Sequence, residues 1–299
     1  SIGHDATHVG PETDVVVISS AVGESNPEVR AARALHIPVI PRAEMLADLM
    51  RPNFGVAVAG AHGKTTTTSL VAAVLGEGGF DPTLVIGGRL NSLGGTNARL
   101  GGSRYMVAEA DESDGSFLLL RPTLAVVTNV DREHMSFYGT MDRLIDAYVS
   151  FINSVPFYGR VILCADCQRV SALLDRVNKR FVTYGTSAQC DLAARDIQVR
   201  GLRTEFEVLH RGVSLGRVEI AMPGRHVALN ALAALAIGLE LGIDFATAAH
   251  ALAVFGGIQR RFEVKGTHGG VTVVDDYGHH PTEIRATLAA ARQGFSGRV

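Results

Sequence analysis

The stretch Gly60-Ala61-His62-Gly63-Lys64-Thr65-Thr66-Thr67 (GAHGKTTT) decides the fold of this 299-residue chain. It lies between two apolar runs, FGVAVA and SLVAAVL, which predict a strand before it and a helix after it. Its glycines let the backbone turn tightly and present N–H groups to an anion, and the helix adds its positive N-terminal end. The full pattern G-x-x-x-x-G-K-[ST] requires glycine at position 58, where the chain has Val58. The stretch alone therefore leaves a phosphate-binding loop and a plain glycine turn as alternatives.

Alternating strand and helix patterns around this stretch predict an α/β fold with a mostly parallel sheet. Strands are expected at 14–20, 55–60, 104–110, 124–130, 160–166 and 180–185. Helices are expected at 26–35, 43–50, 64–79, 140–154, 168–178, 226–241 and 245–254. Paired strand-like stretches from about 190 to 222 predict a small antiparallel appendage. After a linker at Gly256-Gly257, a strand at 270–276 and the start of a helix are expected.

The composition is that of an ordinary globular protein, with 46% hydrophobic and 19% charged residues. A net charge of −2 argues against nucleic acid as a partner. No uncharged apolar run reaches the roughly 18 residues of a membrane helix, so membrane insertion is not expected and a cytoplasmic location is. Cys164 and Cys167 have zinc-knuckle spacing, but no second C-x-x-C supplies further ligands, and Cys164 ends an apolar run. A structural role is therefore favoured for both cysteines.

Polar groups follow two further predicted strands, at the sheet edge where parallel sheets bind ligands. Several carboxylates lie within 109–114, and they repel one another unless they are solvated or bound to cations. Glu109 ends its strand directly and is predicted to be the Mg²⁺ ligand among them. His134 follows the strand at 124–130 and is predicted to hold a metal or phosphate at the same edge. An exposed loop histidine and a solvated acidic turn are the alternatives.

Taken together, the motifs resemble those of the Mur ligases, the ligases of peptidoglycan precursor synthesis. The resemblance rests on seven stretches that occur in this order: GAHGKTTTTSLVAAVL, IGGRLNSLGG, VAEADESDGSF, VVTNVDREH, PGRHVALNALAA, RRFE and VDDYGHHPTE. IPVIPRAEMLADLM at 37–50 and DDYGHHPTE at 275–283 point to the family member that joins L-alanine to UDP-N-acetylmuramate. The resemblance implies ATP and Mg²⁺ as cofactors, those two molecules as substrates, and an amide bond formed through an acyl phosphate.

The resemblance also implies a three-domain organisation. Residues 1–45 would be a partial N-terminal domain for the UDP substrate, 46–257 a central ATP-binding ligase domain, and 258–299 a partial C-terminal Rossmann-like domain. The N-terminal glycine fingerprint for UDP is absent, and the C-terminal region stops about one strand and one helix in. We therefore expect a ligase truncated at both ends.

Residues that match the family motifs inherit expected roles. The implied catalytic residues are Lys64, Glu109 and His134, and the implied Mg²⁺ ligands are Thr65, Glu109 and His134. The implied ATP contacts are Gly60, Ala61, His62, Gly63, Lys64, Thr65, Thr66, Asn230, Arg261 and Asp276. Asn91 and Ser92 are expected near the muramic acid part of the substrate, and Tyr277 and His279 near the incoming amino acid. Two departures from the pattern are Ala61 for a usual threonine and Val227 for the first asparagine of H-N-x-x-N, which weakens part of the adenine contact.

Three alternatives remain open at this point. A murein peptide ligase would join a tripeptide to the same sugar nucleotide, although DDYGHHPTE favours the alanine enzyme. A nucleotide-binding switch would need the phosphate loop but not the combination of Glu109, His134 and GGRLNS. An inactive nucleotide-binding fragment would follow from the two truncated ends.

Overall fold

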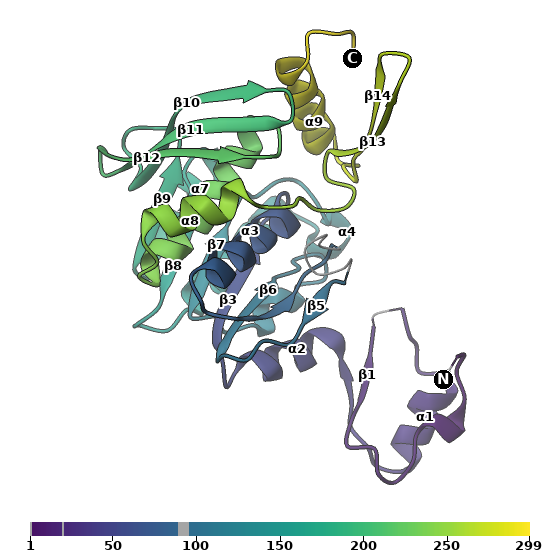
Figure 1. Cartoon of the computed structure of the whole chain (residues 1–299). Coiled ribbons are helices and arrows are strands. Elements are labelled where there is room, and N and C mark those ends of the chain that lie inside the picture. Colours follow the sequence, from purple (N-terminus) through teal and green to yellow (C-terminus); the bar gives the residue numbers. More distant parts are fainter. Residues whose placement is uncertain (1, 20, 89–95) are drawn as a thin grey trace.

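A computed structural model describes residues 2–19, 21–88 and 96–299, and these residues form one large sheet of ten strands with smaller units at both ends (Figure 1). The strands of the large sheet are β3 (Phe54–Ala59), β4 (Thr83–Val85), β5 (Ala98–Arg99), β6 (Tyr105–Glu109), β7 (Leu124–Val127), β8 (Arg160–Cys164), β9 (Phe181–Gly185), β10 (Leu192–Arg200), β11 (Arg203–His210) and β12 (Val213–Ile220). Their order is β12-β11-β10-β9-β8-β7-β3-β6-β4-β5. All neighbours from β10 to β4 are parallel, which confirms the predicted mostly parallel sheet.

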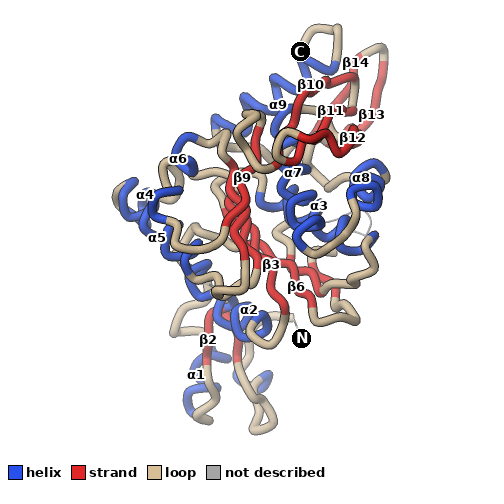
Figure 2. The backbone as a smooth tube through the Cα atoms, turned by 90° about the vertical axis from the view of Figure 1, so that its left-hand side faces the viewer, coloured by secondary structure: helices blue, strands red, loops and turns tan. Residues whose placement is uncertain are grey.

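Helices cover both faces of the parallel part of this sheet (Figure 2). The helices are α1 (Pro27–Ala34), α2 (Arg42–Met50), α3 (Lys64–Glu77), α4 (Met135–Tyr138), α5 (Met141–Asn153), α6 (Gln168–Ser171), α7 (Arg225–Glu240), α8 (Phe245–Ala253) and α9 (Pro281–Gly294), with 3₁₀ turns η1 (Ala6–His8), η3 (Ser116–Leu119) and η4 (Leu174–Arg176). Helices α3, α7 and α8 pack on one face, and α5 packs on the other. Within the described ranges, no helix is long and apolar enough to cross a membrane.

The central strand β3 shows why both faces need helices. Val56 and Val58 belong to the core formed with α3, α7 and α8, whereas Ala57 and Ala59 belong to the core formed with α5. All four side chains are fully buried. Because successive side chains of a strand point to opposite faces, an unbroken apolar run is what a strand covered on both sides requires. The loop at 60–63 therefore leaves the sheet from its middle, between β6 and β7.

The antiparallel part of the sheet lies where the sequence predicts it, at 190–222. Strands β10, β11 and β12 pair antiparallel to one another. Strand β10 also pairs in parallel with β9, with Leu192 opposite Tyr184. The antiparallel strands therefore extend the main sheet.

A small N-terminal unit lies at the end of the molecule far from α9 (Figure 1). It contains β1 (Val16–Ile18) and β2 (Val39–Pro41), which pair in parallel, and helix α1. The side chain of Asn26 caps α1 by accepting the N–H groups of Glu28 and Val29. The strand and helix predicted at 14–20 and 26–35 are both present, in shorter form.

The C-terminal segment forms an antiparallel hairpin of β13 (Glu263–His268) and β14 (Val271–Asp275), followed by α9. The predicted strand at 270–276 and the helix after it are confirmed. Strand β13 was missed because its sequence EVKGTH lacks the apolar residues that indicate a strand. Helix α9 lies beside β10, and the N–H of Gly201 donates to the carbonyl of Gly294 at 2.9 Å.

One predicted helix is wrong in extent. The pattern at 168–178 gives only α6 and the turn η4, with a break between them. The side chain of Asn153 donates to the carbonyl of Arg176 at 3.0 Å and accepts the N–H of Asn178 at 3.0 Å. These bonds fix the chain as it turns toward β9, so tertiary contacts override the helical pattern here.

Candidate nucleotide-binding site

The phosphate loop has the predicted strand–loop–helix context, between β3 and α3. Gly60 has a φ of 137°, and a Cβ there would collide with the hydroxyl of Thr128. Gly63 precedes the helix with a φ of 79°, and a Cβ there would lie 2.8 Å from Oδ1 of Asn230. Both positions therefore require glycine for their backbone conformation and for space. No side chain of the described residues caps α3, so N–H groups of its first turn can bind an anion.

Asn129, at the end of β7, holds the loop in place. Its carbonyl accepts the N–H of Ala61 at 3.2 Å, and its Oδ1 accepts the N–H of His62 at 2.8 Å. Its Nδ2 donates to the carbonyl of His62 at 2.9 Å, and Thr128 Oγ1 donates to the same carbonyl at 2.7 Å. The loop conformation is thus fixed by the neighbouring strand, and the N–H groups of residues 61 and 62 already have partners within the protein.

The amine of Lys64 is in contact with several oxygen atoms of the protein. Its Nζ donates to the carbonyl of Gly60 at 2.7 Å and lies 3.0 and 2.9 Å from the two carboxylate oxygens of Glu112. The side chain of Glu112 is only 1% exposed. Burial raises the pKa of Glu112, although the charge of Lys64 beside it acts in the opposite direction. Any phosphate that reaches Lys64 therefore competes with a carboxylate of the protein itself.

The predicted pair Thr65 and Glu109 is brought together. The hydroxyl of Thr65 donates to Oε2 of Glu109 at 3.3 Å, and the N–H of Gly87 donates to Oε1 at 2.6 Å. Burial raises the pKa of Glu109 against the effect of these two bonds. A hydroxyl and a half-buried carboxylate are oxygen ligands of the type that Mg²⁺ prefers, and a cation would favour the ionised form of Glu109. The residues present therefore fit the ion that the resemblance implies.

His134 lies at the start of α4, with the left-handed φ of 55°. Its Nε2 is 3.7 Å from Oε1 of Glu112 and 3.9 Å from Oε2 of Glu133. One ligand atom from each of these three side chains falls within 4.8 Å of the others. The contacts of His134 are thus with Glu112 and Glu133, two residues for which the sequence gave no specific role. Their only signal was their place in acidic stretches after β6 and β7.

A cavity of about 340 Å³ opens beside the loop, between the central sheet and the C-terminal segment. Six of the predicted ATP contacts line it: His62, Gly63, Thr66, Asn230, Arg261 and Asp276. Apolar side chains including Tyr184, Met222 and Val227 form another part of its wall. A cavity lined partly by a phosphate loop and partly by apolar side chains has the chemistry that a nucleotide requires.

The C-terminal segment contributes groups of two kinds. Asp276 is fixed at the cavity, since its carboxylate accepts the N–H groups of Phe262 at 2.9 Å and Gly278 at 2.8 Å. Tyr277 and His279, predicted near the amino acid, are 49% and 73% exposed and do not line this cavity of the described chain. Asn91 and Ser92 lie outside the described residues.

The sequence missed a second group of polar side chains beside the loop. Asp131 Oδ2 lies 3.1 Å from Nε2 of His62, 2.8 Å from Oγ1 of Thr282 and 3.8 Å from Nδ1 of His280. Glu283 Oε1 lies 3.5 Å from Nδ1 of His62. These contacts join the phosphate loop to the start of α9. Asp131 stands at the carboxyl end of a parallel strand, which is the one signal that the sequence offers for it.

A glycine loop before a helix, a lysine and a threonine at its end, and a half-buried carboxylate on the neighbouring strand define an α/β nucleotide-binding protein of the P-loop class. Within that class, the chain belongs to the Mur ligase family. The family model described as Mur ligase middle domain matches residues 58–238. Those described as Mur ligase, glutamate ligase domain and as Mur ligase family, catalytic domain match residues 260–299 and 1–53. The family resemblance of the sequence motifs is thereby confirmed.

The proteins to which this chain is similar include alanine ligases and a murein peptide ligase. The chain is 60% identical over 294 residues to the UDP-N-acetylmuramate–L-alanine ligase of Geobacter sp. (strain M21), covering 98% of this chain and 63% of that protein. It is similar to the solved UDP-N-acetylmuramate-alanine ligase of Thermotoga maritima, with a TM-score of 0.84, 30% identity, and coverage of 99% of this chain and 67% of that one. It is also similar to a murein peptide ligase of Psychrobacter arcticus, with a TM-score of 0.79, 26% identity, and coverage of 99% and 66%. The chain spans a little under two thirds of the length of its curated relatives.

Proposed function

We propose that this chain carries the ATP-dependent activity that joins L-alanine to the lactyl carboxylate of UDP-N-acetylmuramate, in peptidoglycan precursor synthesis. The observation that carries the proposal is the convergence of Lys64, Thr65 and Glu109 at the carboxyl ends of β3 and β6. The identity of 60% to a Geobacter protein with this name supports the choice of substrates. The family resemblance supports a location in the cytoplasm.

The chemistry explains why these residue types are needed. A carboxylate and an amine do not condense in water, so the γ-phosphate of ATP is first transferred to the lactyl carboxylate. That step brings two anions together, and Lys64 and the N–H groups at the start of α3 offset their repulsion. The amine of L-alanine then attacks the acyl phosphate, and phosphate leaves. Water must be kept away from this intermediate during the second step.

Mg²⁺ neutralises charge on the phosphoryl oxygens when it is bound. In our proposal Thr65 and Glu109 hold one ion, and His134 takes part in a second site beside Glu112 and Glu133. Asn230, Arg261 and Asp276 contact the nucleotide from the cavity wall. Of the predicted ATP contacts, Gly60, Ala61, His62, Gly63 and Thr66 complete the loop around its phosphates.

We further propose the domain limits 1–45, 46–257 and 258–299. The last segment would close over the cavity and exclude water, bringing Tyr277 and His279 toward the amino acid. Gly257 supports this proposal as a hinge, because its φ of 79° lies in the left-handed region and nothing lies within 4 Å of the place where a Cβ would be. Asn91 and Ser92 remain proposed contacts of the muramic acid part.

The test is ADP formation with ATP, Mg²⁺ and UDP-N-acetylmuramate, with and without L-alanine. We expect ADP only when both substrates are present, and much less from the Lys64→Ala variant. The assay is run on this chain and on a protein of its relatives' full length. Activity with the tripeptide acceptor in place of L-alanine would favour a murein peptide ligase. Nucleotide binding without ADP formation in both proteins would overturn the ligase proposal.

A further inference from the structure

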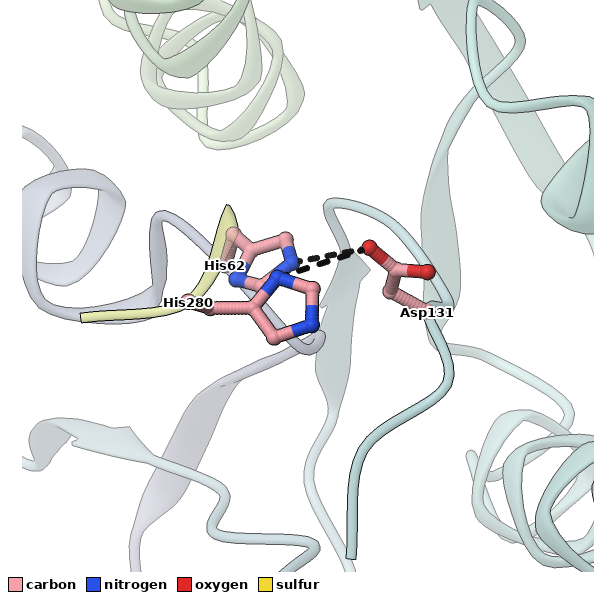
Figure 3. Close-up of side chains that lie close together, drawn as sticks. All are labelled: His62, Asp131 and His280. Carbon is pink, nitrogen blue, oxygen red and sulfur yellow. Dashed lines mark hydrogen bonds and ion pairs between the residues drawn. The ribbon is translucent and has the colours of Figure 1, made fainter. Parts of the chain in front are cut away.

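Three segments far apart in the sequence bring a histidine, an aspartate and a second histidine together beside the cavity (Figure 3). His62 belongs to the phosphate loop, Asp131 follows β7, and His280 is the N-cap residue of α9. This group is different from the Thr65, Glu109 and His134 set to which the proposed function assigns Mg²⁺. It also differs in ligand chemistry, since two of its three donors are imidazole nitrogens.

The donor atoms already have the spacing of a metal site. Nε2 of His62 and Nδ1 of His280 lie 3.1 and 3.8 Å from the same oxygen, Oδ2 of Asp131. All three atoms lie within 4.8 Å of one another. Zinc bonds of 2.0–2.1 Å in a tetrahedral site place two donors about 3.3 Å apart, so the observed distances lie on both sides of that value. The two rings, with centroids 4.6 Å apart, both turn a nitrogen toward the aspartate.

Outer contacts orient these ligands. Oε1 of Glu283 lies 3.5 Å from Nδ1 of His62, which leaves Nε2 directed at Asp131. The other oxygen of Asp131 accepts the N–H of Arg132 at 2.8 Å and an N–H of Arg169 at 3.2 Å, so Oδ2 faces the imidazoles. A carboxylate behind a ligating histidine is the usual outer partner of a zinc site. Side-chain exposures of 11%, 21% and 22% for His62, Asp131 and His280 show a sheltered group, and His62 and Asp131 also line the cavity.

The local charge favours a cation. The carboxylates of Asp131 and Glu283 lie 3.1 and 3.5 Å from the two ring nitrogens of His62. Burial lowers the pKa of His62, but the adjacent carboxylates of Glu283 and Asp131 outweigh that effect and raise it. The same negative surroundings that retain a proton would attract a divalent ion, which then replaces the proton.

We propose that His62, Asp131 and His280 form a binding site for a first-row transition metal ion of the zinc type. Two imidazoles and a carboxylate suit Zn²⁺ or Co²⁺ and not Mg²⁺, which prefers oxygen ligands. The fourth position faces the cavity and takes water or a phosphate oxygen. Because His280 starts α9 and His62 lies in the phosphate loop, the bound ion ties the C-terminal segment to that loop.

The test uses cobalt as a spectroscopic probe, in this chain and without substrates, so it is independent of ligase activity. We expect visible absorption of tetrahedral Co²⁺ that saturates with one ion per chain and is abolished by Zn²⁺. In the metal-free chain Nδ1 of His280 accepts the N–H of Thr282 at 3.3 Å, and it must release that N–H when it binds the ion. The key variant is His280→Asn, because asparagine also caps helices well and can keep the bond to Thr282 while removing the imidazole ligand. The matched control is His279→Asn, the same change at the adjacent histidine, whose side chain is 73% exposed.

We expect His280→Asn to weaken Co²⁺ binding at least about tenfold, and His279→Asn to leave it unchanged. Zn²⁺ should raise the melting temperature of the unchanged chain and of the control, but not that of His280→Asn. Asp131→Asn provides a second variant and should also lose the absorption. Equal Co²⁺ spectra in the two histidine variants, or no tetrahedral spectrum in the unchanged chain, would overturn the proposal. The group would then be a hydrogen-bonded contact alone.

Discussion

Two pairs of carboxylates flank the phosphate loop, and their environments act on them in opposite directions. On the β6 side, Glu112 is fully buried and Glu109 is half-buried, and removal from water raises the pKa of both. Lys64 is the one cation within hydrogen-bonding distance of Glu112 among the described residues. Among the described residues, Glu112 thus has a single close positive charge to offset its burial.

On the α9 side, the carboxylates of Asp131 and Glu283 have several hydrogen-bond donors close to them. Burial opposes ionisation of both, but other groups outweigh it and lower each pKa to about 2. For Asp131 the main one is the hydrogen bond from Thr282, and for Glu283 they are the nearby imidazole of His62 and the N–H of His279. The comparison teaches that a carboxylate near a ligand site can have either of two roles: binding a cation or stabilising a contact within the protein. The β6 pair is suited to a cation that arrives with the nucleotide, whereas the α9 pair stabilises the contact between two parts of the chain even before any metal ion binds beside His62.

The strongest test of the β6 side removes its lysine. We expect Lys64→Ala to lower ADP formation at least about 100-fold, because the phosphate loses its closest positive charge. Steady-state ADP release measures this, with Lys265→Ala as a control at an exposed lysine. A rate near that of the unchanged protein would remove Lys64 from the proposed chemistry.

A second substitution tests whether Glu109 is a ligand of Mg²⁺. We expect Glu109→Gln to raise the Mg²⁺ concentration needed for half-maximal activity by about tenfold or more, since a neutral amide is a weak Mg²⁺ ligand. The readout is a Mg²⁺ titration of ADP formation. Asp111→Asn, in the same acidic run but exposed, is the matched control. An unchanged titration for Glu109→Gln would mean that the ion binds elsewhere.

The α9 side is tested by stability. We expect Asp131→Asn to lower the free energy of unfolding at pH 7 by about 1–2 kcal/mol, after allowance for its partial exposure to solvent. The sign follows from a folded pKa near 2 against an ordinary 3.8: the contribution is present above the ordinary pKa and is lost as the pH falls toward 2. Urea unfolding from pH 7 to pH 3 measures it. The control is Asp48→Asn. Asp48 forms an exposed ion pair with Arg51, and its substitution should show no such loss.

The smallest expected effect is on the β6 side, where the stability of a Glu112 variant can be compared with that of Asp131→Asn. We expect Glu112→Gln to change the free energy of unfolding at pH 7 by less than about 1 kcal/mol in either direction, because relief from a buried charge offsets the loss of the carboxylate partner of Lys64. Lys64 keeps the carbonyl of Gly60 as an acceptor. Since burial raises the folded pKa of Glu112, any gain should shrink as the pH falls toward its ordinary 4.5. A loss as large as that of Asp131→Asn would show that the two sides do not differ in this way.

The sequence predicted the features that depend on local pattern. The apolar run before Gly60 predicted β3, and the glycines predicted the loop. The rule that ligands gather at the carboxyl ends of parallel strands brought Thr65 and Glu109 together correctly. These features succeed because strand periodicity and glycine conformation are properties of neighbouring residues.

Other features depend on contacts that no short stretch contains. The burial of Glu112 comes from packing, including the hydroxyl of Tyr138, which donates to its carbonyl at 2.5 Å. The contact of His62 with Asp131 spans 69 positions, and that of Thr282 with Asp131 spans 151. Directions of side chains across such separations follow from the packed fold, so the sequence could name a histidine in the loop but not its partners.

The ion pair between Lys64 and Glu112 also bears on the rates of nucleotide association and dissociation. Because Glu112 already balances the charge of Lys64, the lysine adds little net field at long range to steer an approaching polyphosphate. Its attraction begins at contact, once a phosphate oxygen takes the place of the carboxylate. Lys64 therefore governs how long a nucleotide stays bound and has little influence on how often one arrives.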